Sequence, residues 1–262
     1  MLKKLKKLLR FISIYGFSRT INKAIARMRV GNKKIYWKRG RKNISIIGCG
    51  QFAFSCISYF LARNKGNVFL DCYDIELKNA KSLGYYYRFR NVVNTPEELV
   101  LNKELETLYI ASTHTTYAIQ AMEKGVKSLY LEKPLSTSYE QFLSLINNQR
   151  KYEATLYVGY NRPYSQAVKK LQSALGDIKS SNNAFSVNYF ISGHLIGDDH
   201  WYRNYDEGTR VCGNMGHWLD LSIHILSWRA LPETISIQIA YSNINESDDN
   251  ITVNMTTEKG DL

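Results

Sequence analysis

The first forty-two residues carry a helical pattern of apolar and basic positions. Leu2, Leu5, Leu9 and Ile12 recur at helical spacing, with lysines and Arg10 between them. The spacing predicts a basic amphipathic helix. Such a helix can lie on an anionic membrane surface, or it can pack on the protein's own body or on a second subunit. The pattern alone leaves these alternatives open.

From Asn43 onward, short apolar runs alternate with helical patterns. We expect strands at 44–47, 68–73, 108–111, 128–131 and 155–160, and helices at 52–62, 76–83, 116–124 and 139–150. Thr95-Pro96 followed by Glu98 predicts a further capped helix start. The run Tyr85–Tyr87 is typical of a half-buried strand. Strands separated by helices indicate right-handed crossovers and a parallel sheet.

Beyond about Ala184 the pattern favours strands. We expect strands at 185–191, 233–241 and 251–256, interrupted by one helix at 216–226. This order indicates a second domain with an open, mostly antiparallel sheet.

The distribution of charge changes the picture more than its total does. The chain has 35 Lys and Arg against 23 Asp and Glu, a net charge of +12 that would favour a nucleic-acid partner. However, residues 1–42 hold 15 basic and no acidic residues, whereas residues 43–262 hold 20 basic and 23 acidic ones. The body is therefore mildly acidic and carries a cationic arm, and we expect no nucleic-acid partner.

Four cysteines without C-x-x-C spacing indicate free thiols in a reducing compartment. No apolar stretch has the length of a membrane span, and the N-terminal apolar run lacks the features of a signal peptide. We therefore predict a cytoplasmic protein, peripheral at the inner membrane face if the arm binds lipid.

The first strand of the alternating region ends in a glycine turn. Gly48-Cys49-Gly50-Gln51-Phe52-Ala53 fits the dinucleotide pattern G-x-G-x-x-A between a strand and a helix. Gly48 would form the tight turn, and Gly50 would let backbone approach a pyrophosphate at the helix N-terminus. Asp74 or Asp71 follows near the end of the next strand; we prefer Asp74, whose carboxylate would bind ribose hydroxyls and favour NAD over NADP. The alternative is a glycine turn that binds no nucleotide.

Several further motifs stand in order along the chain. They are Leu108-Tyr109-Ile110-Ala111-Ser112-Thr113-His114, Leu131-Glu132-Lys133-Pro134-Leu135-Ser136, Gly159-Tyr160-Asn161-Arg162, His200-Trp201-Tyr202 and the run Gly213–Leu221. With the glycine turn, they resemble the Gfo/Idh/MocA family of oxidoreductases over about residues 43–262. The triplet Glu132-Lys133-Pro134 is the most specific of these motifs.

The resemblance implies an α/β fold in which a Rossmann domain with helices on both faces precedes an open-sheet substrate domain, with the site in the cleft between them. We accordingly divide the chain into an arm (1–42), an NAD-binding domain (43–162) and a partial substrate or oligomerisation domain (163–262). Family members mostly oxidise a sugar or cyclitol hydroxyl or run the reverse reduction, and often hold the Lys-Pro bond cis. Relatives usually continue beyond the point where this sequence stops, so we expect an incomplete sheet and, where the sheet is complete, a homo-oligomer.

The resemblance also implies roles for individual residues. The catalytic residues would be Lys133, reaching the reacting hydroxyl, and His217, acting as general base. The cofactor would be bound by Gly48, Gly50, Gln51, Phe52, Ala53, Asp74, Ser112, His114, Glu132 and Lys133. The substrate would be bound by Lys133, Arg162, Trp201, Tyr202, Asn214, His217 and Asp220.

Elementary chemistry supports the two catalytic roles. Alcohol oxidation sends a hydride to the nicotinamide while a proton leaves oxygen, and histidine can accept that proton near neutral pH. A nearby ammonium group stabilises the developing alkoxide.

The sequence departs from the family pattern at three places. Gly213 stands where many members have an aspartate, and Tyr117 stands where many have a histidine, for which His114 is a partial substitute. The glycine-rich run before the final motif is thinned to Gly208-Thr209-Arg210. Asn214 resembles another branch of the family, which has a polar or acidic group there. These departures bear on the proton relay and on the identity of the substrate.

Two other groups of residues can each be interpreted in two ways. His217, Asp220 and His224 share one helix face, a spacing that can bind a metal but more often combines one functional histidine with packed neighbours; we predict no metal. Trp201, Tyr202, Trp218 and His200 could stack on a sugar ring or form the core of the second domain.

We therefore predict an NAD-dependent oxidoreductase acting on a sugar, sugar nucleotide or cyclitol, in surface-polysaccharide biosynthesis. The alternative is a catalytically impaired nucleotide-binding or scaffold protein derived from such an enzyme.

Overall fold

The computed structural model describes residues 2–29, 31–112, 115–175, 183–193, 196–197, 200, 203, 208–243 and 250–262. Contacts divide the chain into two compact units. Unit 1 comprises residues 1–132 and 143–157, and unit 2 comprises residues 133–142 and 158–262. Each unit is described by itself.

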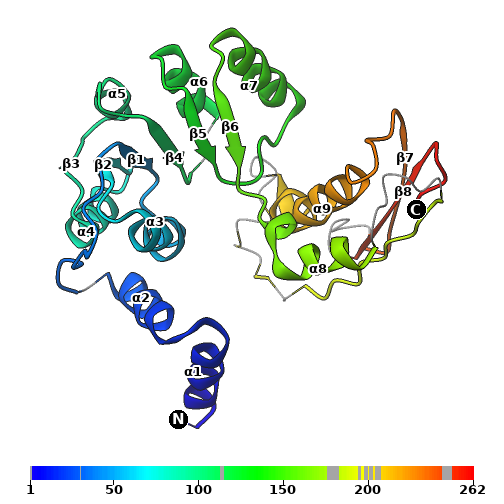
Figure 1. Cartoon of the computed structure of the whole chain (residues 1–262), viewed down its shortest axis with the longest axis horizontal. Coiled ribbons are helices and arrows are strands. Elements are labelled where there is room, and N and C mark those ends of the chain that lie inside the picture. The colour runs from blue at the N-terminus through cyan, green and yellow to red at the C-terminus, as the bar shows by residue number, and fades with distance from the viewer. Residues whose placement is uncertain are drawn as a thin grey trace. The chain divides into compact units, whose positions relative to one another are not determined.

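Unit 1 is built on a six-stranded sheet in the order β3-β2-β1-β4-β5-β6 (Figure 1). The strands are β1 (Ile44–Ile47), β2 (Phe69–Tyr73), β3 (Asn91–Val92), β4 (Thr107–Ile110), β5 (Ser128–Leu131) and β6 (Thr155–Val158). Strand β1 pairs in parallel with β2 on one side and with β4 on the other, and all four of its residues are buried. The central strand therefore carries the glycine turn at its carboxyl end.

Helices connect these strands, as the crossover pattern predicts. They are the π-helix η1 (Ala53–Ile57) continued by α3 (Ser58–Lys65), then α4 (Leu77–Tyr87), α5 (Pro96–Val100), α6 (Thr115–Glu123) and α7 (Tyr139–Lys151). Thr95 caps α5, because its hydroxyl oxygen accepts the Glu98 N–H at 3.3 Å. The predicted parallel sheet with intervening helices is confirmed.

The N-terminal arm contains two helices rather than the single one that the apolar spacing predicts. Helix α1 (Leu2–Tyr15) and helix α2 (Phe17–Met28) are separated by Gly16, which has a φ of 84°. A positive φ interrupts a right-handed helix and is readily adopted by glycine. Asn22 and Ala26 of α2 are buried, and α2 packs on η1.

The core of unit 1 is rich in aromatic rings. Phe54, Phe69 and Tyr87 are fully buried, with the Tyr87 ring centroid 5.2 Å from Phe54 and 5.5 Å from Phe69. The prediction of a strand at Tyr85–Tyr87 is wrong, because these residues form the last turn of α4. Ala80, Leu83 and Tyr87, spaced by three and four residues, all face the core and extend the helical period to the end of the run.

Unit 2 combines helices with one antiparallel hairpin in its described part. Its elements are the short helix η2 (Arg162–Tyr164), α8 (Gln166–Leu175), the π-helix η6 (Val211–Met215), α9 (Gly216–Leu226), and strands β7 (Ile235–Tyr241) and β8 (Ile251–Thr257), which pair with each other. Its core joins Val168 of α8 to Leu221, Ile225 and Trp228. The predicted α/β fold with a later antiparallel element is thus confirmed. The Lys133–Pro134 peptide bond is cis.

The prediction of a strand at 185–191 is wrong. The segment 183–193 is extended and alternates in exposure, but no strand is assigned there. Two backbone hydrogen bonds join this segment to Leu262. The Leu262 carbonyl accepts from the Val187 N–H at 2.9 Å, and the Leu262 N–H donates to the Phe185 carbonyl at 3.1 Å. Alternation makes a strand only where a partner supplies a longer ladder.

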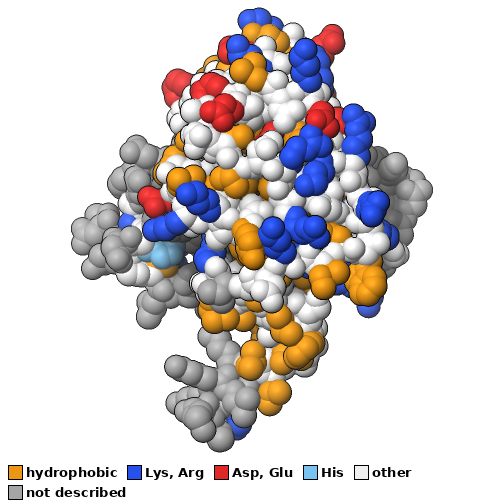
Figure 2. All heavy atoms as spheres, turned by 90° about the vertical axis from the view of Figure 1, so that its left-hand side faces the viewer, with side chains coloured by type: hydrophobic (Ala, Val, Ile, Leu, Met, Phe, Trp, Pro, Cys, Tyr) orange, Lys and Arg blue, Asp and Glu red, His pale blue; other side chains and the backbone are white. Residues whose placement is uncertain are grey.

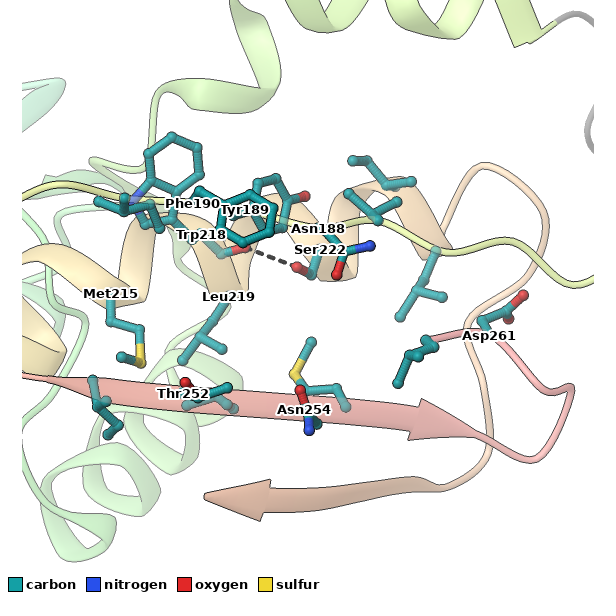
Figure 3. A pocket seen from close by; sticks show the side chains of 18 of the residues that line it. Asn188, Tyr189, Phe190, Met215, Trp218, Leu219, Ser222, Thr252, Asn254 and Asp261 are labelled. Atoms are coloured by element: carbon teal, nitrogen blue, oxygen red, sulfur yellow. Dashed lines mark hydrogen bonds between the residues drawn. The ribbon is translucent and has the colours of Figure 1, made fainter. Parts of the chain in front are cut away.

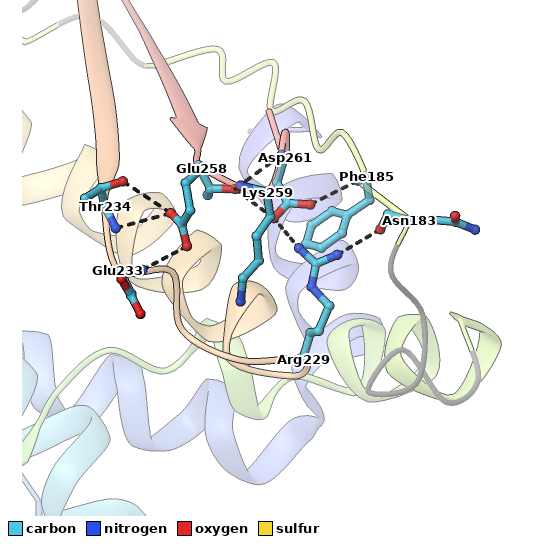
Figure 4. A network of polar contacts seen from close by, with 9 residues as sticks. Asn183, Phe185, Arg229, Glu233, Thr234, Glu258, Lys259 and Asp261 are labelled. Atoms are coloured by element: carbon cyan, nitrogen blue, oxygen red, sulfur yellow. Dashed lines mark hydrogen bonds and ion pairs between the residues drawn. The ribbon is translucent and has the colours of Figure 1, made fainter.

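A buried ion pair joins the chain segments at this end of unit 2 (Figure 4). The Arg229 guanidinium lies 2.5 Å from an Asp261 carboxylate oxygen and also donates to the Asn183 carbonyl at 2.8 Å. The other Asp261 oxygen accepts the Phe185 N–H at 3.2 Å. Because both charges are buried and hydrogen-bonded, the pair links the turn after β8 to the 183–193 segment.

The four cysteines, all within the described part of the chain, are free thiols, as their spacing predicts. None of the helices that the structure describes is both long and apolar enough to cross a bilayer.

The Tyr87 hydroxyl should be a measurable link between the arm and the helices α4 and η1. It lies 2.7 Å from the Phe54 carbonyl and 3.0 Å from the Asn22 side-chain oxygen. Tyr87→Phe removes the donor and leaves buried acceptors unpaired, so the free energy of unfolding should fall by about 1–3 kcal/mol. Tyr85→Phe, in the same helix but exposed, is the matched control. Chemical denaturation measures both, and equal midpoints for the two variants would contradict the assignment.

Candidate functional site

The glycine turn lies where the ends of β1 and β4 approach each other. Gly48 has a φ of 84°, and a Cβ on it would come within 2.7 Å of the Ala111 backbone and 3.1 Å of the Ser112 nitrogen. Both the positive φ and this close approach require glycine. Ser112, one of the predicted cofactor residues, is thereby placed beside the turn.

The next glycine has a different surrounding. A Cβ at Gly50 would meet no heavy atom within 4 Å, so the backbone is open on that side. Gln51 and Phe52 are exposed, whereas Ala53 is buried and lets the helix pack closely. The first N–H groups of a helix have no intrahelical acceptor and can bind an anion. The turn therefore offers exposed backbone of the type that binds phosphate.

Asp74 holds this turn through its carboxylate. One oxygen accepts the Cys49 N–H at 2.6 Å, and the other accepts the Glu76 N–H at 2.8 Å. Asp71, the other candidate, is buried and accepts from the side-chain amides of Asn91 and Asn102 at 2.7 and 2.6 Å. Asp71 thus has a structural role inside the sheet, while Asp74 lies at the glycine turn.

Arg29, at the end of α2, also binds the glycine turn, and the sequence pattern did not identify it. Its guanidinium donates to the Cys49 carbonyl at 2.8 Å and to the Ser82 hydroxyl at 3.0 Å, and it lies 5.1 Å from the Phe54 ring centroid. The backbone of Cys49 is therefore held from both sides, by Asp74 at N–H and by Arg29 at C=O. A contact between residues so far apart in the sequence leaves no local pattern.

The remaining predicted cofactor residues are placed as follows. Glu132 follows β5, and its carboxylate accepts from the Tyr130 hydroxyl at 3.0 Å. His114 lies outside the described residues, and Lys133 belongs to unit 2. Tyr117, where the family resemblance led us to look for a histidine, packs on Tyr73 with ring centroids 6.4 Å apart.

In unit 2, the predicted catalytic residues lie around the junction of η6 and α9. The Lys133 ammonium group donates to the Gly213 carbonyl at 2.9 Å. Burial, together with the nearby charges of Arg162 and Lys133, lowers the pKa of His217 from 6.5 to about 4. The imidazole is consequently neutral at neutral pH and able to accept a proton.

Tyr160 contacts the same histidine. Its ring centroid lies 5.6 Å from that of His217 in an edge-on arrangement. A Cβ on Gly216 would come within 3.0 Å of the Tyr160 oxygen, so the glycine makes room for the hydroxyl at the start of α9. Burial raises the pKa of Tyr160, which keeps the phenol protonated. Tyr160 belongs to a motif found in the sequence, but the pattern alone assigned it no role.

Some polar atoms near this junction are buried and have no hydrogen-bond partner within the described part of the chain. They include His217 Nδ1 and one carboxylate oxygen of Asp220. Burial also raises the pKa of Asp220. Buried polar atoms without partners are uncommon and mark places where a ligand or water can bind.

Among the other predicted substrate residues, the Arg162 guanidinium lies 4.4 Å from the Trp218 ring centroid, and Asn214 lies in η6. Trp201 and Tyr202 lie outside the described residues. Among the described side chains, no group of three or more His, Cys, Asp or Glu residues is placed to hold a metal ion.

A separate cavity of about 630 Å³ lies deeper in unit 2 (Figure 3). Tyr189, Phe190 and Trp218 line one side, and β8 residues such as Thr252 and Asn254 line the opposite side. Neither Lys133 nor His217 lines it. Trp218 also packs on Tyr189, with ring centroids 5.3 Å apart, and contacts the core of unit 2.

Comparison with known proteins agrees with this geometry. Residues 42–160 match the family model described as oxidoreductase family, NAD-binding Rossmann fold (GFO_IDH_MocA). The myo-inositol 2-dehydrogenase of Thermotoga maritima is 28% identical over 82 residues, 30% of this chain and 25% of that protein.

Solved structures share the fold more widely. The WlbA dehydrogenase of Chromobacterium violaceum, determined with NADH and UDP-GlcNAcA, has a TM-score of 0.70 and 19% identity, over 89% of this chain and 68% of its own. The myo-inositol dehydrogenase of Lactobacillus casei, determined with NAD(H) and myo-inositol, has a TM-score of 0.63 and 18% identity, over 84% of this chain and 65% of its own. The chain thus spans a quarter of the myo-inositol 2-dehydrogenase and about two thirds of these structures.

The low pKa of His217 can be measured directly. Its imidazole NMR signal should titrate near pH 4, because burial and two cations disfavour the charged form. Arg162→Ala should move the midpoint toward 6.5, while Arg162→Lys keeps the charge and should preserve a low midpoint. As the pH falls from 6.5 to about 4, the unfolded chain takes up this proton first, so stability should decrease over that window. A midpoint at or above 6.5 in the unmodified protein would contradict the arrangement.

Proposed function

Since residues 42–160 belong to the Gfo/Idh/MocA oxidoreductase family, we propose that this protein is an NAD-dependent oxidoreductase. It transfers a hydride between the nicotinamide and a hydroxyl or keto carbon of a sugar, sugar nucleotide or cyclitol. The observation that carries the proposal is the glycine turn, open at Gly50 and held by the Asp74 carboxylate.

The residues at this turn fit a dinucleotide. The open backbone at Gly50 and the helix that follows suit a pyrophosphate, which binds backbone N–H groups at a helix N-terminus. The Asp74 oxygens keep lone pairs beyond their two N–H contacts, so they can accept from ribose hydroxyls. A carboxylate at that position repels a 2′-phosphate, which favours NAD over NADP.

The unit 2 residues supply the proton chemistry. When bound, the nicotinamide supplies the hydride acceptor or donor. His217, neutral at physiological pH, accepts the proton of the substrate hydroxyl. The ammonium of Lys133 and the guanidinium of Arg162 stabilise negative charge that develops on the substrate oxygen. Tyr160 keeps the His217 ring in place through its edge-on contact.

The substrate class rests on the relatives. Two of the structures that share the fold were determined with myo-inositol or UDP-GlcNAcA, and a curated relative is a myo-inositol 2-dehydrogenase. Both ligands carry ring hydroxyl groups of the kind that hydride transfer oxidises. We extend the proposal to a role in surface-polysaccharide biosynthesis, where sugar nucleotides are the substrates.

Replacing the proposed proton-transfer residues should abolish turnover without abolishing cofactor binding. His217→Asn and Lys133→Met should each lower kcat by about 100-fold or more, since general acid–base groups contribute factors of that order. NADH fluorescence titration should give unchanged affinity in His217→Asn, and Lys133→Met should still bind NADH. Turnover is screened with myo-inositol and UDP-sugars by nicotinamide absorbance. Unchanged kcat, or lost NADH binding in both variants, would contradict the assigned roles.

The wild-type protein in the same screen tests the proposed function as a whole. NADH binding without turnover of any hydroxylated sugar would favour the alternative, a nucleotide-binding or scaffold protein derived from such an enzyme.

Cofactor preference tests Asp74. Asp74→Ala should weaken NADH binding more than NADPH binding, because it removes the ribose acceptor and the repulsion of the 2′-phosphate together. Glu76→Ala, an exposed carboxylate two residues away, is the matched control and should leave both affinities unchanged. An unaltered NADH-to-NADPH ratio in Asp74→Ala would remove Asp74 from the ribose site.

A further inference from the structure

The arm (residues 1–42) exposes an apolar strip on α2. Phe17, Ile21, Ala24 and Met28 follow one another at spacings of four, three and four residues, and all four are exposed, Phe17 to 66%. This spacing places them on one face of the helix. The buried residues Asn22 and Ala26 lie on a different face of α2, which packs on the rest of unit 1. The strip is therefore presented outward by a helix that is anchored on its other side.

Helix α1 adds further exposed apolar side chains. Leu8, Leu9 and Ile14 are each about half exposed or more. Helix α1 packs on α2, where the Lys23 ammonium lies 4.7 Å from the Phe11 ring centroid. Figure 2 shows hydrophobic side chains gathered toward the lower end of this face, with Lys and Arg side chains above them. Soluble proteins rarely expose apolar side chains in such a group unless it binds something.

The segment after α2, residues 31–42, also combines exposed apolar side chains with basic ones. The Tyr36 hydroxyl donates to the Tyr87 carbonyl at 2.7 Å, which ties the segment to unit 1. Its neighbours Ile35 and Trp37 are 77% and 98% exposed. Lysines and arginines at 33, 34, 38, 39, 41 and 42 surround them. An exposed tryptophan among cations is typical of a side chain that lies at a membrane interface.

A cavity of about 530 Å³ opens beside this tryptophan. Lys34, Lys38 and Arg63 are its charged lining residues, and no carboxylate lines it. Trp37 and Tyr59 are among its aromatic lining residues. Burial lowers the pKa of Lys34, so an anion in the cavity would relieve the cost of its charge. The cavity thus has the chemistry of a phosphate site beside exposed apolar side chains.

We propose that the arm docks the protein onto an anionic phospholipid bilayer. The strip on α2 and the Trp37 side chain enter the headgroup region, and Lys34, Lys38 and Arg63 bind lipid phosphate. A basic side chain near an anionic bilayer contributes about 1 kcal/mol, and residues 1–42 hold 15 of them without one acidic residue.

Charge and polarity favour this partner over two others. A second copy of the chain would bring an equally cationic arm, and like charges repel across an interface. A nucleic acid would match the cations but would leave the aliphatic side chains Ile21, Met28 and Leu9 without apolar partners. A bilayer with anionic headgroups matches both, and this inference does not depend on dinucleotide binding.

Vesicle flotation of the full chain tests the proposal. The protein should float with phosphatidylcholine vesicles that contain phosphatidylserine, remain unbound with phosphatidylcholine alone, and lose binding as salt is raised. The triple variant Phe17→Ser/Ile21→Ser/Trp37→Ser should bind about tenfold more weakly or worse, because it removes buried apolar area. Ile75→Ser, which replaces an 81% exposed apolar residue outside the arm, should bind like the unmodified protein.

A second test variant, with a matched control, examines the role of the charged cavity. Lys34→Gln/Lys38→Gln should weaken binding to the anionic vesicles, whereas Lys78→Gln/Lys81→Gln, on exposed positions of α4, should not. Thermal unfolding and NADH affinity, unchanged in every variant, verify that the fold and the cofactor site persist. Equal flotation with neutral vesicles, or arm variants that float like the unmodified protein, would overturn the proposal. Arm-dependent dimerisation, or arm-dependent oligonucleotide binding tighter than vesicle binding, would also overturn it in favour of those partners.

Discussion

The backbone of Cys49 is the point on which the glycine turn depends. Its N–H donates to Asp74 and its C=O accepts from Arg29, so both peptide groups around this residue are held. Gly48 adds a backbone conformation that other residues strain to adopt, and it lies against the end of β4. Together these contacts connect three separate parts of unit 1: the arm, the central strand and the end of β2. The same carboxylate that holds the turn in this structure is the one proposed to bind ribose, so fold and cofactor recognition share one side chain.

The proposed chemistry draws on residues of both units. Unit 1 has the glycine turn with its exposed backbone, whereas the proposed proton-transfer groups lie around the start of α9 in unit 2. There, burial lowers the pKa of His217, and the cations that would stabilise an alkoxide lower it further, because positive charge disfavours imidazolium. In the proposed reaction, one arrangement would therefore serve two needs of alcohol oxidation: a base that is available at neutral pH and a positive field at the reacting oxygen. The weaker basicity of such a histidine would lower the driving force for proton acceptance, and the neighbouring cations would compensate by stabilising the alkoxide that loss of the proton forms.

The pattern of apolar residues predicted correctly those strands and helices whose bounds depend on neighbouring residues in the sequence. The strand 44–47 with its glycine turn and the helix 216–226 have the predicted bounds, because each has a glycine at one end and a clear run of apolar positions. At 185–191 the alternation of apolar and polar residues predicted a strand that the structure does not have. The backbone there has too few hydrogen bonds to a neighbouring segment to form one. At Tyr85–Tyr87 aromatic composition suggested a strand, but the period set by Ala80 and Leu83 continues the helix. Arg29 and Tyr160 acquire their roles from contacts with distant residues, which no local pattern encodes.

The most direct test of the central claim is an amide NMR titration of the isotope-labelled protein with NADH. If the glycine turn binds the dinucleotide, the backbone N–H signals of Cys49, Gly50, Gln51 and Phe52 should move together and saturably. The signals of the β7–β8 hairpin should stay in place. Saturable shifts that leave the turn unaffected, or no shifts on addition of NADH, would contradict the account.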